Sequence, residues 1–164
     1  MIVPDINLLV FAYHSGSPFH AKVAAWWQAC LSGTEPVGLP QVVVFGFLRI
    51  STNTKIFQDP LTPSEAIRHI RAWLEQPAVQ LLPSDSHQVE EAFKLLETLG
   101  AAGNLVTDAQ IAVAALDNRA VVHTSDSDFA KFPNLRWFNP ITEAAGMPVS
   151  KKRSKADPPP RFRR

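Results

Sequence analysis

The stretch Met1–Val10, MIVPDINLLV, decides the fold that we predict for the whole chain. An apolar run leads to one carboxylate, Asp5, and the polar Asn7 precedes a second apolar run. This pattern predicts a short buried strand that ends at Asp5 and a helix that starts directly after it. Open α/β sheets bind ligands at the carboxyl ends of their strands. Asp5 is therefore the first candidate site residue.

Length and composition indicate one globular domain. The chain has 164 residues, of which 46% are apolar, enough for a single domain with a proper core. The one cysteine, Cys30, excludes an internal disulfide framework and a cysteine-based zinc site. No basic segment precedes an apolar stretch at the N-terminus, and no apolar run approaches the roughly 20 residues of a membrane helix. We therefore expect a cytoplasmic protein that does not engage a membrane.

The net charge of +1 hides an asymmetry between the body and the C-terminal end. Residues 147–164 carry seven of the 16 Lys and Arg residues but only one of the 15 acids. Residues 1–146 therefore hold nine basic and 14 acidic residues, a net charge of about −5. If the substrate is a polyanion, a local patch, a metal ion or the tail must hold it.

Helical and strand patterns alternate along the chain. Strands are expected at residues 1–5, 37–39, 79–82, 120–123 and 135–138. Helices are expected at residues 6–14, 19–31, 41–52, 62–75, 85–99 and 107–116, with a short helix or turn at 126–131. The alternation predicts an α/β fold: a mostly parallel central sheet of about five strands, flanked by helices on both faces.

Some of these boundaries rest on specific signals. Residues 41–52 are β-branched enough for a strand, but their apolar spacing favours a helix. Capping boxes predict helix starts at Thr62 and at Thr107, and Ser17 followed by Pro18 predicts another. From Met147 onward, Lys, Arg, Ser and Pro dominate. We therefore divide the chain into a domain at residues 1–142 and a basic, Pro-rich, disordered tail at 143–164.

Four aspartates are the candidate catalytic residues. Asp5 follows the first strand, Asp108 lies at a helix start, and Asp126 and Asp128 follow the fourth strand. In a parallel sheet these positions share one edge, although each acid alone also fits an ordinary helix N-terminus. Carboxylates crowded together repel one another unless a cation neutralises them, and Mg²⁺ prefers oxygen ligands. Such a site suits phosphodiester hydrolysis by metal-activated water.

Four stretches together resemble the PIN-domain ribonucleases, specifically the VapC-type toxins of bacterial toxin–antitoxin pairs. They are residues 1–9, 46–52, 107–110 and 124–129, and their order and spacing carry the likeness. The resemblance implies a Mg²⁺- or Mn²⁺-dependent endoribonuclease that hydrolyses structured RNA such as tRNA or rRNA. It also implies a cognate VapB-like antitoxin and a homodimer.

The resemblance assigns roles to individual positions. Asp5, Asp108 and Asp126 match metal-binding acids. Asp128 matches a second acid of the same loop, which binds the metal through water or holds the loop. Asn7 matches a small polar position near the scissile phosphate.

The third expected helix departs from the family pattern. Many PIN domains carry a glutamate there, but residues 41–55 contain no acid, and Gly46 occupies or adjoins the position. Three explanations are open: the aspartates suffice, a water fills the space over Gly46, or the metal is held more weakly. Arg49 in this helix either meets an RNA phosphate or, the reading we favour, pairs with a site carboxylate.

The missing acid motivates an alternative function: a catalytically weakened PIN-fold module that binds RNA or a partner. A phosphatase-like hydrolase of the same sheet class is the weaker third hypothesis. The chain has no glycine-rich loop of the kind that cradles a phosphate.

Overall fold

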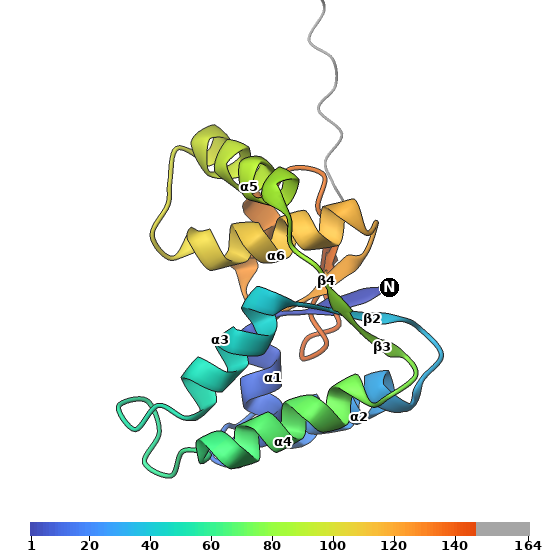
Figure 1. Ribbon diagram of the computed structural model, residues 1–164, viewed down its shortest axis with the longest axis vertical. Coiled ribbons are helices and arrows are strands. Elements are labelled where there is room, and N and C mark those ends of the chain that lie inside the picture. Colours follow the sequence, from blue (N-terminus) through green and yellow to red (C-terminus); the bar gives the residue numbers. More distant parts are fainter. Residues whose placement is uncertain (147–164) are drawn as a thin grey trace, which may run out of the picture.

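The computed structural model describes residues 1–146, in which strands and helices alternate (Figure 1). Within these residues, six strands form one sheet in the order β3-β2-β1-β4-β5-β6. All neighbouring strands are parallel except β5 and β6, which are antiparallel. The strands are β1 (Ile2–Pro4), β2 (Val37–Pro40), β3 (Val79–Leu82), β4 (Val121–His123), β5 (Trp137–Phe138) and β6 (Ala145–Gly146).

In the described part of the chain, six α-helices flank this sheet, and they form two groups (Figure 1). In Figure 1, α5 and α6 lie on one side of the sheet, and α1, α2 and α4 lie on the other. The helices are α1 (Ile6–Tyr13), α2 (His20–Ser32), α3 (Gln41–Ser51), α4 (Pro63–Leu74), α5 (Ser86–Leu99) and α6 (Leu105–Asp117), with a 3₁₀ helix, η1 (Ser127–Lys131). The predicted α/β class and the helix at residues 41–52 are confirmed.

The core explains why β1 is central. Every residue of β1 and β2 is buried, as expected for parallel strands covered on both faces. On the α1–α4 side, the fully buried rings of Trp27, Phe47 and Trp73 pack against one another. The indole N–H of Trp73 donates to the Tyr13 hydroxyl at 2.7 Å, which ties α4 to α1. These contacts anchor α1 directly behind the end of β1.

Strand register brings two strand ends to the same level. Ile2 pairs with Val121 and Pro4 with His123, so β1 and β4 end side by side. The Asp5 N–H continues this pairing and donates to the His123 carbonyl at 2.8 Å. The chain order reverses between β1 and β4, because β2 and β3 lie beyond β1 on one side and β5 beyond β4 on the other. This switch point is where open α/β sheets bind ligands.

Two predicted helix starts are wrong and one is confirmed. Thr62 and Glu65 form the reciprocal capping box that begins α4. By contrast, α6 begins at Leu105, so Thr107 lies inside its first turn and makes no cap. Ser17 also precedes its helix by one turn, and its hydroxyl accepts from the Phe19 N–H at 3.2 Å while α2 begins at His20.

The predicted domain boundary after residue 142 is also wrong. Residues 145–146 form β6, a sixth strand at the edge of the sheet that pairs with β5. The chain reverses through a turn in which the Asn139 side chain accepts from the Ile141 N–H and Glu143 adopts a φ of 61°. This side-chain-supported turn gave no apolar pattern in the sequence. The rest of the predicted disordered tail, residues 147–164, lies outside the described residues.

No helix within residues 1–146 is long and apolar enough to cross a membrane.

Candidate active site

Asp5 lies at the end of β1 and is almost completely buried, with 3% of its surface exposed. Burial raises the pKa of its carboxyl group from 3.8 to about 6. The Thr124 hydroxyl and the N–H groups of Ile6 and Asn7 favour the ionised form and oppose this rise, while Asp126 adds to it. Within residues 1–146, Asp5 is therefore a carboxylate that receives hydrogen bonds but makes no ion pair with a cation.

Thr124 connects the ends of β1 and β4, and sequence reasoning did not name it as a site residue. Its hydroxyl donates to Asp5 Oδ2 at 2.8 Å and accepts from the Asp126 N–H at 2.9 Å. Thr124 is 1% exposed, so both bonds are sheltered from water. One hydroxyl thus fixes the Asp5 side chain and the backbone of the loop that carries Asp126.

Asp108 lies in the first turn of α6, the end of that helix at the carboxyl edge of β4. Its pKa is raised from 3.8 to about 7, first by burial and then by the charges of Asp5, Asp126 and Asp128. Lys131 is the cation that lowers it. The structure therefore brings all four predicted acids into one electrostatic cluster, and Asp108 experiences each of the others.

The loop after β4 holds its two acids by local hydrogen bonds. Asp126 is the N-cap of η1, and its Oδ1 accepts from the Asp128 N–H at 2.8 Å. Asp128 in turn pairs with Lys131, with Nζ 2.7 Å from Oδ1. Asp128 is thus partly neutralised within the protein, whereas no ion pair within residues 1–146 neutralises Asp5, Asp108 or Asp126.

The donor chemistry of this cluster fits a hard divalent cation. Asp5, Asp108 and Asp126 offer carboxylate oxygens, the ligands that Mg²⁺ and Mn²⁺ prefer. Burial, and after it the charges of Asp5, Asp126 and Asp128, raise the pKa of Asp108, and Lys131 opposes this rise. Among residues 1–146, however, no three His, Cys, Asp or Glu side chains already stand close enough to form a finished metal site. The cluster therefore fits a metal ion in donor type and charge.

The two predicted substrate-binding residues lie in different surroundings. Asn7 is exposed in the first turn of α1, two residues from Asp5, which is compatible with its predicted place near a phosphate. Arg49 is exposed in the last turn of α3 and makes no ion pair with any acid of residues 1–146. The pairing that we favoured for Arg49 is therefore absent from this part of the chain.

Gly46 faces the residue that follows Asp5. A Cβ atom at Gly46 would lie 2.3 Å from Ile6 Cδ1 and 2.9 Å from Ile6 Cγ1. The buried Ile6 side chain thus fills the space over Gly46, and the water suggested for that space is excluded. The α3 side of the site is consequently an apolar wall, and the carboxylates come from β1, α6 and the loop after β4.

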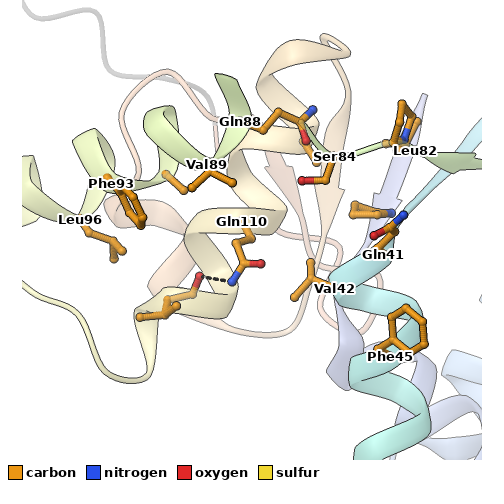
Figure 2. Close-up of a pocket in the computed structure, with 15 residues that line it drawn as sticks. Gln41, Val42, Phe45, Leu82, Ser84, Gln88, Val89, Phe93, Leu96 and Gln110 are labelled. Atoms are coloured by element: carbon orange, nitrogen blue, oxygen red, sulfur yellow. Dashed lines mark hydrogen bonds between the residues drawn. The ribbon is translucent and has the colours of Figure 1, made fainter. Parts of the chain in front are cut away.

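An apolar groove of about 470 Å³ lies on another face of α6 (Figure 2). Val106, Gln110 and Ala114 of α6 line it, whereas Asp108 does not. At 3.6 residues per turn, Asp108 points to the side of the helix away from these residues. In Figure 2, Phe93 and Leu96 of α5 lie on one side of the groove and Phe45 of α3 on the other. The groove and the acidic cluster are separate features that share one helix.

The strand order, the switch point and the acidic cluster define the class: an α/β domain with an oxygen-rich anionic site at the carboxyl edge of a parallel sheet. Comparison with known proteins identifies the family. The sequence profile of the PIN domain matches residues 2–135, and the chain belongs to the PIN domain family.

Two ribonucleases of Mycobacterium tuberculosis that resemble this chain support its membership of the family. Ribonuclease VapC33 of Mycobacterium tuberculosis is 43% identical over 143 residues, which are 87% of this chain and 100% of that relative. Ribonuclease VapC43 of the same species is 36% identical over 143 residues, 86% of this chain and 96% of that relative.

Solved structures share the fold at lower identity. Mycobacterium tuberculosis VapC20, described as a Sarcin-Ricin loop cleaving toxin, has a TM-score of 0.62 at 15% identity, covering 79% of this chain and 93% of that one. VapBC2 from Rickettsia felis, bound to a DNA fragment from its promoter, has a TM-score of 0.59 at 17% identity, covering 84% of this chain and 97% of that one.

Proposed function

We propose that this protein is a VapC-type toxin, an endoribonuclease that requires Mg²⁺ or Mn²⁺ to hydrolyse RNA phosphodiester bonds. The observation that carries the proposal is the acidic cluster, in which Asp108 experiences the charges of Asp5, Asp126 and Asp128 at the switch point of the sheet. The 43% identity to Ribonuclease VapC33 supports RNA as the substrate.

In this proposal the metal ligands are Asp5, Asp108 and Asp126. A bound divalent ion supplies an activated water and stabilises charge on the phosphate. Thr124 holds the Asp5 carboxylate through its 2.8 Å hydrogen bond, so one ligand is oriented before any ion arrives. Lys131 compensates Asp128, which leaves Asp128 to hold the loop. Asn7 is exposed two residues from Asp5, and in this proposal its side chain donates to a phosphate oxygen.

The raised pKa values also bear on ion binding. Asp108, with a pKa of about 7, is partly protonated at neutral pH in the metal-free protein. A cation must displace this proton, so ion binding strengthens as the pH rises through 7. The apolar wall made by Ile6 against Gly46 lowers the local polarity on one side, which strengthens every charge interaction at the site.

The names of its relatives support two proposed partners. We propose a cognate VapB-like antitoxin, because structural neighbours include VapBC complexes such as VapBC2 from Rickettsia felis. Structured RNA, tRNA or rRNA, is the proposed substrate, since VapC20 is described as cleaving the Sarcin-Ricin loop.

We assign the groove of Figure 2 to a second copy of this chain. Phe45 is 65% exposed and Phe93 55% exposed, and both line the groove. Exposed apolar surface around a hollow marks an interaction site. A face that carries both a hollow and protruding rings can pair with itself about a two-fold axis. This supports the predicted homodimer.

The test is cleavage of a tRNA transcript by the purified protein in Mg²⁺, in Mn²⁺ and in EDTA. We expect metal-dependent cutting that Asp108→Asn abolishes while the circular dichroism spectrum is unchanged. Asp117→Asn, an exposed acid at the far end of the same helix, is the matched control and should cut normally. Binding of RNA without cutting in either metal would instead favour the alternative, a catalytically weakened binding module.

A further inference from the structure

We propose that Lys131 binds a backbone phosphate of the RNA beside the acidic cluster, and so positions the substrate at the site. The proposal rests on the nuclease function proposed above and names a residue that touches the substrate. Every RNA carries this phosphate, and phosphate contacts carry no sequence information, so the contact is independent of which RNA is cut.

The fold fixes the backbone that carries Lys131. This residue ends the 3₁₀ helix η1, and the Asp126 carboxylate caps the start of η1 by accepting from the Asp128 N–H at 2.8 Å. The rings of Phe129 and Phe132 are both buried, with centroids 5.9 Å apart. In addition, η1 packs against α6, whose first turn forms one side of the candidate site. Lys131 therefore has a defined place next to the acids.

The Lys131 side chain reaches toward the acidic cluster and keeps donors for a ligand. Its Nζ lies 2.7 Å from Asp128 Oδ1, and its charge lowers the pKa of Asp108. An ammonium has three N–H donors. Within residues 1–146 no backbone carbonyl accepts from Lys131, whereas Lys22 Nζ donates to the Ile141 carbonyl at 2.7 Å. Because the Lys131 side chain is also 54% exposed, a phosphate oxygen can approach it from solvent.

The charge at the site calls for a cation in this position. When ionised, the four clustered aspartates carry about −4 in total, and the divalent ion of the nuclease proposal supplies +2. The remaining charge of about −2 repels every RNA phosphate, and Lys131 halves it. A lysine suits this task because its compact charge binds phosphate. Its ion-pair partner, Asp128, is not among the proposed metal ligands, so Lys131 does not compete with the metal ion.

Other cations of the described residues lie elsewhere. Arg119 and Arg136 shortly precede β4 and β5, so both lie at the amino edge of these parallel strands, opposite the acids. Arg49 lies in the last turn of α3, whose first turn follows the carboxyl edge of β2. Eight residues of helix, about 12 Å, separate Arg49 from that edge. Among the charges of residues 1–146, Lys131 is the cation that acts on Asp108.

Stability gives a weak explanation for the ion pair of Lys131. Both of its side chains are partly exposed, and exposed ion pairs contribute little to folding. The loop is already held by the Thr124 hydroxyl, which accepts from the Asp126 N–H at 2.9 Å. A second ion pair, Lys94 with Glu91 on α5, has the same spacing in sequence, a distance of 2.8 Å and a lysine that is 56% exposed. Lys94 is not among the charges that shift the pKa of Asp108, so it provides a matched control.

The experiment compares four full-length proteins: the natural chain, Lys131→Met, Lys131→Arg and Lys94→Met. Binding of two fluorescein-labelled 20-nucleotide RNAs of unrelated sequence is measured by anisotropy, in EDTA, from 50 to 200 mM KCl. The values of kcat and KM are measured for cutting of a tRNA transcript in Mn²⁺. Calorimetry without RNA then measures the affinity of each protein for Mn²⁺.

We expect Lys131→Met to bind both RNAs about tenfold more weakly at 50 mM KCl, the effect of one charged hydrogen bond. The slope of log K against log salt should become shallower by about 1, so the deficit shrinks to about 2.5-fold at 200 mM KCl. In cutting, the loss should appear mainly as a higher KM, because the contact already exists in the bound substrate.

The other proteins separate charge from structure. Lys131→Arg keeps the charge and should restore the salt slope, and Lys94→Met should behave as the natural chain. Mn²⁺ should bind Lys131→Met at least as tightly as the natural chain, because a cation that repels the metal ion has been removed.

Equal affinity and salt slope for the natural chain and Lys131→Met would overturn the proposal, as would a loss confined to one of the two RNAs. Weaker Mn²⁺ binding by Lys131→Met with an unchanged salt slope would also overturn it, since Lys131 would then only support the loop. Failure of the nuclease proposal looks different: the natural chain would cut nothing in Mg²⁺ or Mn²⁺, while the binding of RNA in EDTA would still distinguish Lys131→Met from Lys94→Met.

Discussion

Replacing Asp5 by Asn should stabilise the metal-free protein at neutral pH while abolishing its nuclease activity. Asp5 has a folded-state pKa of about 6 against 3.8 for an unperturbed carboxyl. The folded state therefore prefers the protonated form, and ionisation of Asp5 costs stability as the pH rises through 6. At pH 7.5 the full difference of about 2 pKa units, about 3 kcal/mol, opposes folding.

Asn removes this cost and keeps most of the geometry. Its Oδ1 can still accept from the Thr124 hydroxyl, as Asp5 Oδ2 does at 2.8 Å. Loss of the charge weakens that bond and the favourable contact with the N–H groups of Ile6 and Asn7, by about 1 kcal/mol in total. The expected net gain at pH 7.5 is therefore about 2 kcal/mol, or about 4–8 °C in Tm for a protein of this size.

The assay is urea unfolding followed by tryptophan fluorescence, in EDTA, at pH 7.5 and pH 4.5. At pH 4.5 the wild-type cost falls to about 1 kcal/mol, because folded Asp5 is then mostly protonated. The advantage of the variant should disappear there. Asp59→Asn, in an exposed loop, controls for the loss of one negative charge. The reasoning is refuted if Asp5→Asn is less stable than wild type at pH 7.5, or if its effect is the same at both pH values.

Three further predictions follow from the same contacts. Gly46→Ala should destabilise the protein by about 1–3 kcal/mol, because the new Cβ would lie 2.3 Å from Ile6 Cδ1. In a double-mutant cycle measured by urea unfolding, adding Ile6→Ala should recover part of this loss. If the free-energy changes of the two substitutions simply add, the contact is contradicted. The metal-free wild type should lose stability between about pH 4 and 7, because burial raises the pKa of Asp5 to about 6 and that of Asp108 to about 7. In thermal melts, 10 mM Mg²⁺ should reduce this loss of stability. A pH profile that Mg²⁺ leaves unchanged would count against the metal site. Phe93→Asp, which places a charge in the groove of Figure 2, should convert a dimer to a monomer in light scattering without unfolding it, because Phe93 is 55% exposed; an unchanged mass would remove the groove as the dimer surface.

The fold was predictable because its signals are local. The alternation of apolar runs gave the α/β class, and the capping box at Thr62 gave the start of α4 within one residue. The short strand before residues 41–52 was enough to favour a helix there over a strand. The sixth strand was missed because two residues of β6 carry no apolar alternation, and its turn depends on Asn139 and a positive φ at Glu143.

The site was predictable only in part, because the contacts that the sequence did not reveal join residues that are far apart in the chain. Thr124 donates to Asp5 across 119 positions of sequence, and nothing adjacent to Thr124 announces that bond. The one available sequence signal was its place two residues before Asp126, the first of two spaced aspartates. In the same way, Gly46 looked like a missing acid, and only the approach of Ile6 shows that the space is filled. Composition could not reveal either contact.

The two parts of the proposed function have opposite electrostatic requirements. A metal site needs carboxylates that stay uncompensated until the ion binds, whereas RNA needs positive charge. Cations placed among the acids also satisfy the acids, as Lys131 does for Asp128 at 2.7 Å. Such pairing would lower the pKa of Asp5 and Asp108 and weaken the demand for a metal ion.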